Sequence, residues 1–280
     1  MECNLENITV HYETFGEGRP IVVIHGWDAD HRQAIDHFEP VFSQRDGWRR
    51  IYADSPGMGK TRGEAWVTSS DNMLDVMTQF VDGVIPGQRF ALAGVSYGSY
   101  LARGLAHRRA SLVDGAVFVV PVLTPDRDKR IRPEHNVLVK DEGFVTSLSD
   151  LNPDLAEAGL NFVVVQNIRW FDNPWWQTYI AEAGHLVDEQ FLARLHERYA
   201  LSVDLDAVSE PCSAPMLFLL GRQDTLGYPR SLDFLKNYPR ASFAILDRAG
   251  HGLWLEQPLL YKVLLNEWLD RVEEWTLSLG

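Results

Sequence analysis

The chain has 280 residues, of which 45% are hydrophobic, 11% aromatic and 23% charged, a composition typical of globular proteins and unlike that of disordered or fibrous chains. Its formal net charge of -13 would repel a phosphate backbone, so we expect no nucleic-acid partner. The apolar runs fall far short of the roughly 20 residues that span a bilayer, and residues 1–6 lack the basic start of a signal peptide. We therefore expect a soluble cytoplasmic protein with no membrane span.

Cysteine and histidine spacing gives no sign of a metal centre. Cys3 and Cys212 lie far apart in the sequence without CxxC spacing, so we expect two free thiols rather than a disulfide framework or a cysteine zinc site. His25, His31 and His37 recur every six residues, which matches neither one helix face nor a metal-binding motif. No metal and no cofactor is expected.

In chain order, the first predicted strand covers residues 8–12, where apolar and polar residues alternate as in a strand with one wet face at a sheet edge. Further short runs are apolar on both faces, as in buried parallel strands, at residues 21–24, 50–53, 90–93, 116–120, 216–220 and 243–246. Residues 99–107 and 255–275 carry apolar side chains at helical spacing. Together these patterns predict the α/β class, with a mostly parallel, doubly wound central sheet flanked by helices.

One connection is too long for a single crossover helix. Roughly 95 residues separate the predicted strands that end at Val120 and begin at Met216, which predicts an inserted substructure above the sheet. We assign residues 122–205 to this cap and residues 1–121 and 206–280 to the core domain. The cap holds many aromatic residues: Phe144, Phe162, Trp170, Phe171, Trp175, Trp176, Tyr179, Phe191 and Tyr199. They are expected to form the cap's own core or to line an apolar substrate pocket.

The clearest chemical signal is a G-x-S-x-G pattern at residues 94–98, directly after a predicted strand and at the start of a predicted helix. Such a turn holds its serine in a strained backbone conformation with the hydroxyl exposed. Side chains in place of Gly94 or Gly98 would collide with the tight turn. We therefore interpret Ser96 as a nucleophile, the alternative being a structural turn serine.

Several motifs in order resemble those of the α/β-hydrolase superfamily over essentially the whole chain. His25-Gly26 resembles its oxyanion-loop signature, and residues 54–59 resemble the loop after the next strand. The Ser96 turn, residues 221–224 and residues 250–252 follow in the same order. The resemblance implies an α/β-hydrolase fold with a mainly helical cap inserted after the sixth core strand, and it implies that His25 and Gly26 shape the oxyanion loop, as Gly94 and Gly98 shape the serine turn.

A serine hydroxyl becomes nucleophilic only when a neighbouring base accepts its proton. Of nine histidines, His251 is the best placed, because it follows the last predicted strand between Gly250 and Gly252 in a loop that can reach the carboxyl edge of the sheet. We predict that His251 is this base.

The third catalytic group must orient the imidazole and stabilise its positive charge. Asp224 follows the predicted strand 216–220 and preserves the order serine, aspartate, histidine. Asp126 is the alternative, because some relatives place the acid after the strand that ends here near Val120. Asp247 and Glu256 are interpreted as surface or helix-start charges.

Two backbone N–H groups are needed to stabilise the oxyanion of acyl transfer, and by position we assign them to Trp27 and Tyr97. The Trp27 side chain is then expected either at the pocket mouth or packed with its indole N–H satisfied. Asp28 and Asp30 are interpreted as solvated loop carboxylates, with a site for a cationic substrate group as the alternative.

These assignments predict a serine hydrolase with an acyl-enzyme intermediate, acting as a carboxylesterase on a small to medium apolar ester. The alternatives are a carbon–carbon bond hydrolase, an aminopeptidase or a perhydrolase with the same triad, or a non-catalytic ligand-binding member of the fold. The loop sequence after Gly26, which begins with Trp27, departs from the prolyl aminopeptidase pattern. The expected partner is a small-molecule substrate, and the oligomeric state stays open.

Overall fold

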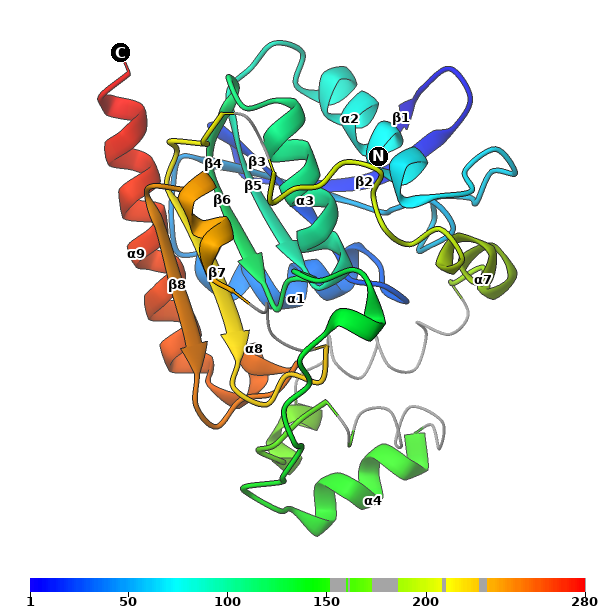
Figure 1. Ribbon diagram of the computed structural model, residues 1–280, viewed down its shortest axis with the longest axis vertical. Helices are drawn as coiled ribbons and strands as arrows, with labels where there is room; N and C mark the ends of the chain where they lie inside the picture. The colour runs from blue at the N-terminus through cyan, green and yellow to red at the C-terminus, as the bar shows by residue number, and fades with distance from the viewer. Residues whose placement is uncertain (152–159, 161, 173–185, 208–209, 227–230, 280) are drawn as a thin grey trace.

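The computed structural model describes residues 1–151, 160, 162–172, 186–207, 210–226 and 231–279. These residues form an eight-stranded sheet in the order β1-β2-β4-β3-β5-β6-β7-β8 (Figure 1). The strands are β1 (Glu2–Asn4), β2 (Thr9–Phe15), β3 (Arg19–Ile24), β4 (Trp48–Ala53), β5 (Phe90–Val95), β6 (Val113–Val119), β7 (Met216–Gly221) and β8 (Ala241–Leu246). The pairs β1/β2 and β2/β4 are antiparallel and all others are parallel, so the predicted mostly parallel sheet is confirmed.

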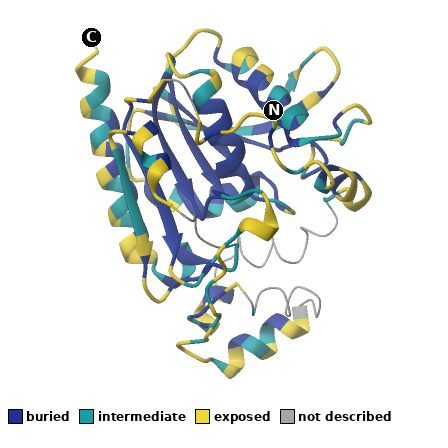
Figure 2. Ribbon diagram, viewed as in Figure 1, coloured by how far each residue is buried: buried dark blue, intermediate teal, exposed yellow. Residues whose placement is uncertain are grey.

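Helices cover both faces of the sheet. α1 (His31–Phe42) and α9 (Pro258–Leu277) pack on one face, and α2 (Ser70–Val84) and α3 (Tyr97–Arg108) on the other. β3 shows why the apolar runs have no polar face: Ile21 and Val23 join the core under α1 and α9, whereas Val22 and Ile24 join the core under α2 and α3. Because successive side chains point to opposite faces, a strand covered on both sides is apolar throughout, and Figure 2 shows the central strands buried along their length.

The two ends of the sheet differ from the expectation. The predicted edge strand, β2, is not at the edge, because the three-residue strand β1 pairs with its outer side. At the opposite end, β8 was expected to be buried but is an edge strand, and its Ile245 side chain is 40% exposed. An apolar run identifies a strand, but the order of strands in the sheet depends on tertiary packing.

Three helices begin at residues whose side chains favour a helix start. Asp30 and Ser69 accept hydrogen bonds from the first-turn N–H groups of α1 and α2, respectively, as expected of helix N-caps. The predicted helix 99–107 is α3. The predicted helix 255–275 is divided into the short α8 (Leu253–Glu256) and α9, whose first residue, Pro258, suits a helix start.

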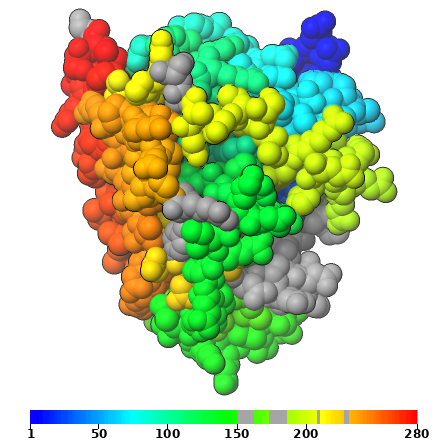
Figure 3. All heavy atoms as spheres, in the orientation of Figure 1, coloured from blue at the N-terminus to red at the C-terminus, as the bar shows by residue number. Residues whose placement is uncertain are grey.

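The long connection between β6 and β7 contains η1 (Arg127–Lys129), α4 (Glu142–Leu151), η2 (Ile168–Asp172) and α7 (Glu189–His196), and η4 (Asp233–Asn237) follows β7. The part that carries α4 lies beyond the carboxyl ends of the strands and forms the lower end of the molecule in the views shown (Figures 1 and 3). The boundaries of the cap at residues 122 and 205 stay a prediction. Within the described ranges, no helix combines the length and apolarity needed to cross a membrane.

Candidate active site

Ser96 lies between the end of β5 and the first residue of α3, in a backbone conformation that residues other than glycine rarely adopt. Its φ is 53° and its ψ is -117°, and its N–H donates to the Val119 carbonyl at 2.8 Å. Although it occupies the N-cap position, its side chain makes no capping hydrogen bond to α3. The strained turn thus places a partly exposed serine at a helix N-terminus, where the helix dipole favours negative charge.

Gly94 and Gly98 are required by the close packing around this turn. A Cβ on Gly94 would lie 2.6 Å from the Gly98 backbone, and a Cβ on Gly98 would clash with the carbonyl oxygens of Ile24 and His25. The neighbouring Ser99 hydroxyl donates to the Gly94 carbonyl at 2.6 Å. The start of α3 is therefore pressed against the ends of β3 and β5 without room for a side chain.

The loop after β3 passes directly beside Ser96. A Cβ on Gly26 would lie 3.5 Å from the Ser96 Cβ, and the Gly26 N–H donates to the Gln33 side-chain oxygen at 2.9 Å. His25 Nε2 accepts from the Ser55 N–H at 2.9 Å, so its other ring nitrogen, Nδ1, donates to the Gly26 carbonyl at 2.7 Å. Burial lowers the pKa of His25. These contacts hold a neutral His25 in one tautomer and fix the course of the loop.

Trp27 extends from this loop over an aromatic group. Its ring packs edge-on against Tyr97, with centroids 4.9 Å apart, and lies 5.5 Å from the ring of Tyr199. The Tyr97 hydroxyl forms a 2.7 Å hydrogen bond with the Ser70 hydroxyl. Ser70 in turn donates to the Tyr199 carbonyl. The indole is therefore both packed and half-buried. The N–H of Tyr97, the first residue of α3, has no acceptor within the helix.

His251 and Asp224 meet across the carboxyl ends of the last two strands. His251 Nδ1 lies 3.0 and 3.1 Å from the two Asp224 carboxylate oxygens. Asp224 is buried and also accepts from the Leu226 N–H at 2.9 Å. The His251 N–H donates to the Phe162 carbonyl at 2.7 Å, so a residue of the β6–β7 connection holds the histidine loop. The buried carboxylate directs the Nδ1 proton, so the neutral ring carries its lone pair on Nε2.

The other carboxylates considered from the sequence have different roles. Asp126 is exposed, caps η1 and pairs with Lys129 at 2.9 Å. Asp28 is an exposed residue, although partial burial of its carboxyl group raises its pKa. The interpretation of Asp30 as a solvated carboxylate is wrong, because it is buried, caps α1 and forms an ion pair with Arg32 at 2.6 Å. A charge that serves as a helix cap is easily missed when the helix itself is not predicted.

Glu256 was also misinterpreted as a surface charge. It is buried, and its carboxylate accepts hydrogen bonds from Val164 at 2.6 Å, Val165 at 3.0 Å and Gly250 at 2.7 Å. Burial raises the pKa of Glu256 to about 7, with the nearby Asp224 charge adding to the shift and the three N–H donors opposing it. This side chain joins the loop of His251 to the β6–β7 connection. Its position in sequence, at the end of the short helix α8, gave no sign of that role.

The described aromatic residues of the β6–β7 connection belong to several environments. Phe144, Trp170 and Phe171 form a small separate core, and Phe191 and Tyr199 pack against the main core. Phe162 is 36% exposed, with its ring 5.4 Å from that of His251. Trp175, Trp176 and Tyr179 lie outside the described residues.

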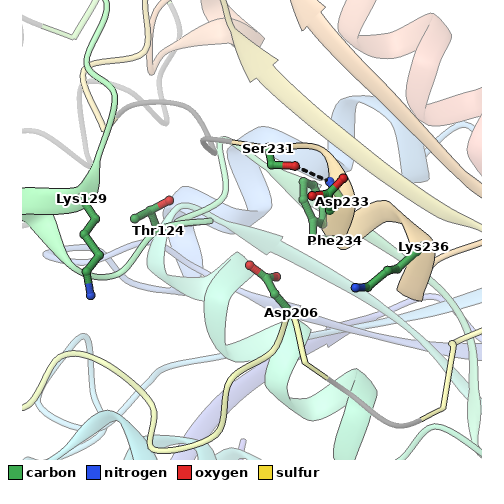
Figure 4. A pocket seen from close by; sticks show the side chains of 7 residues that line it. All are labelled: Thr124, Lys129, Asp206, Ser231, Asp233, Phe234 and Lys236. Atoms are coloured by element: carbon green, nitrogen blue, oxygen red, sulfur yellow. Dashed lines mark hydrogen bonds between the residues drawn. The ribbon is translucent and has the colours of Figure 1, made fainter.

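A hollow of about 320 Å³ lies elsewhere on the molecule, between the start of the β6–β7 connection and η4 (Figure 4). Its lining is mostly polar and charged: Thr124, Lys129, Asp206, Ser231, Asp233, Phe234 and Lys236. It contains neither Ser96 nor the pair of His251 and Asp224. We therefore place the candidate active site at Ser96 and not in this hollow.

A profile of the Alpha/beta hydrolase family matches residues 21–261, which include Ser96, Asp224 and His251. The chain belongs to this family. Two curated relatives of this α/β hydrolase are named pimeloyl-(acyl-carrier protein) methyl ester esterase. The protein from Legionella pneumophila is 25% identical over 273 residues, covering 94% of this chain and 100% of the relative. The protein from Nitrosomonas europaea is 27% identical over 255 residues, covering 89% and 95%.

A solved structure, an alpha/beta superfamily hydrolase from Oenococcus oeni, matches this α/β hydrolase with a TM-score of 0.83 and 26% sequence identity. The match covers 98% of this chain and 99% of the other. The expected α/β-hydrolase fold is therefore confirmed.

Proposed function

We propose that this α/β hydrolase is a serine hydrolase that cleaves carboxylic esters through an acyl-enzyme. The observation that carries the proposal is the strained Ser96 turn at the same sheet edge as the hydrogen-bonded pair of His251 and Asp224. The three residues follow the parallel strands β5, β8 and β7, respectively, and ligands of open α/β sheets bind at the carboxyl ends of the strands.

In the proposed reaction, Ser96 Oγ attacks the ester carbonyl while His251 Nε2 accepts its proton. Asp224 holds the imidazole through Nδ1 and stabilises the imidazolium. The backbone N–H groups of Trp27 and Tyr97 stabilise the oxyanion, aided by the N-terminus of α3. His251 then protonates the departing alcohol, and a water activated by the same histidine releases the acid and regenerates Ser96.

The substrate is proposed to be a small to medium ester with an apolar group. The two relatives described above are named for a methyl ester, which makes methyl esters of acyl chains the first compounds to test. The partly exposed rings of Trp27 and Phe162 lie near the reacting groups and would contact an apolar acyl or alcohol group.

The test is the intact mass of the protein after treatment with a fluorophosphonate, which labels activated serines. We expect one adduct, located on Ser96 by peptide mapping and absent from the Ser96→Ala variant. The Ser111→Ala variant, which alters an exposed serine, is the matched control and should be labelled as fully as wild type. Hydrolysis of methyl esters with acyl chains of increasing length should be lost in Ser96→Ala alone.

A folded wild-type protein that acquires no adduct, or one labelled on another serine, would contradict the acyl-enzyme mechanism. Tight binding of an ester without turnover would instead favour the ligand-binding alternative.

A further inference from the structure

Two histidines and a glutamate that take no part in the proposed reaction converge on one side of the sheet. His11 and Glu13 lie on β2, and His31 is the first residue of α1. One ligand atom from each of the three side chains lies within 4.8 Å of those of the other two. Because His11 and Glu13 are two residues apart on a strand, their side chains project from the same face.

His31 is oriented by a buried carboxylate. Its Nδ1 lies 2.8 Å from Asp54 Oδ1, which also accepts the His31 backbone N–H at 2.7 Å. Asp54 is fully buried, and its second oxygen accepts from the Lys60 N–H. In the neutral ring, the proton on Nδ1 is directed to Asp54 and the lone pair of Nε2 faces Glu13. Metal-binding histidines are commonly held in this way by an outer carboxylate.

The distances suit a transition-metal ion. His31 Nε2 lies 3.3 Å from Glu13 Oε1, and tetrahedral zinc with bonds of about 2.0–2.1 Å separates its donor atoms by roughly 3.3 Å. The same contact is an ion pair when His31 is protonated, and an ion bound between the two atoms would replace that pair.

His11 supplies the third donor. Its ring centroid lies 5.2 Å from that of His31, and its Nε2 is buried with no hydrogen-bond partner among the described residues. A buried polar atom without a partner costs free energy, and coordination of an ion would remove that cost.

We propose that His11, Glu13 and His31 form a binding site for a divalent transition-metal ion of the zinc type. Two imidazoles with one carboxylate favour such an ion over magnesium or calcium, which prefer oxygen donors. Three carboxylates, those of Glu13, Asp30 and Asp54, lie near the histidines. The positive charges that act on the same histidines are those of Lys60 and the amino terminus. The local charge therefore also favours a cation.

The ion would have a structural role. It would join β2 to the first turn of α1, which directly follows the loop that contains Trp27. A second grouping, formed by Asp30, His31 and Asp54, would need the nitrogen of His31 that already donates to Asp54, and Asp30 is paired with Arg32. The site on β2 needs neither of these contacts to break.

The experiment is a zinc titration of the full chain, without an affinity tag and stripped of metal, in competition with a chromophoric chelator. We expect one equivalent to bind, and cobalt in its place to show the visible ligand-field bands of a low-coordinate site. His11→Gln and Glu13→Gln should each weaken binding at least tenfold. An ion that binds only the folded protein stabilises the folded state. Zinc should therefore raise the Tm of wild type more than that of either variant.

The matched controls are His135→Gln and Glu17→Gln, which remove a histidine and a glutamate outside the cluster and should bind zinc as wild type does. His251→Gln should also retain binding, and its loss there would place the ion at the catalytic pair and overturn the proposal. Equal affinity in His11→Gln and wild type would overturn it as well. So would nitrogen NMR spectra in which His31 stays protonated on both ring nitrogens after zinc is added, because His31 would then simply bridge Asp54 and Glu13 as an imidazolium.

Discussion

At the scale of single residues, the hydrogen bond between Asp224 and His251 determines which ring nitrogen can act as a base. Asp224→Asn keeps the size of the side chain but places an amide where a carboxylate accepts the Nδ1 proton. An amide N–H facing Nδ1 favours the tautomer that carries its proton on Nε2, which cannot take a proton from Ser96. We expect kcat for ester hydrolysis to fall on the order of 10⁴-fold, measured with a methyl ester under saturating conditions.

Asp126→Asn is the control, because Asp126 is exposed and pairs with Lys129. It should leave kcat within about twofold of wild type, since no contact given for the described residues links Asp126 to His251 and exposed ion pairs contribute little. If Asp126→Asn had the larger effect, the assignment of Asp224 as the triad acid would be wrong.

Single-residue predictions from the sequence succeeded where a motif fixed the local backbone. The Ser96 turn is an example, because its glycines and serine are adjacent in sequence and determine the strained conformation themselves. Glu256 is the opposite case. Its partners Val164 and Val165 lie about ninety residues earlier in the chain, so no pattern around residue 256 distinguishes this carboxylate from one on the surface.

At the scale of elements, the crossing of α3 over β3 and β5 depends on Gly98. A Cβ at this position would clash with the carbonyl oxygens of Ile24 and His25, and backbone atoms at the end of a central strand cannot move without disturbing the sheet. We expect Gly98→Ala to lower the free energy of unfolding by about 3 kcal/mol or more, measured by denaturation with urea.

Gly104→Ala, in the same helix, is the matched control. A Cβ there would meet the terminal methyl group of Leu74 at 2.7 Å, which can rotate away, and alanine favours a helix over glycine by about 1 kcal/mol. Its free energy of unfolding should stay within about 1 kcal/mol of wild type. Equal losses in the two variants would contradict the argument that carbonyl contacts make Gly98 necessary.

The strands were easier to predict than their arrangement. A continuous apolar run identifies β3 and β5 because each is covered by helices on both faces. The same signal cannot distinguish a central strand from an edge strand such as β8, nor can it detect β1, which has only three residues and no such run. The proximity of His11 to His31 could not be predicted for a similar reason, because it arises only when the fold brings β2 and α1 together.

At the scale of the whole molecule, Glu256 joins two parts of the chain that are distant in sequence, the loop of His251 and residues 164–165. Its carboxyl group has a pKa of about 7 in the folded protein, against an ordinary value of 4.5, chiefly because it is buried. Between these values the folded state binds a proton that the unfolded state has already released. The contribution of Glu256 to stability is therefore greatest below pH 4.5 and is lost as the pH rises toward 7.

This shift predicts that the free energy of unfolding of wild type, relative to that of Glu256→Gln, falls by ~3 kcal/mol between pH 4.5 and pH 7. Glutamine does not titrate, so the difference between the two proteins isolates the ionisation of this one group. Urea denaturation at half-unit pH intervals provides the measurement, with the exposed Glu274→Gln variant as the matched control. A difference that stays constant over this range would mean that Glu256 ionises in the folded protein as it does in the unfolded chain. In that case either the three N–H donors offset the effect of burial on the pKa, or the carboxylate is solvated and its link to residues 164–165 does not persist in solution.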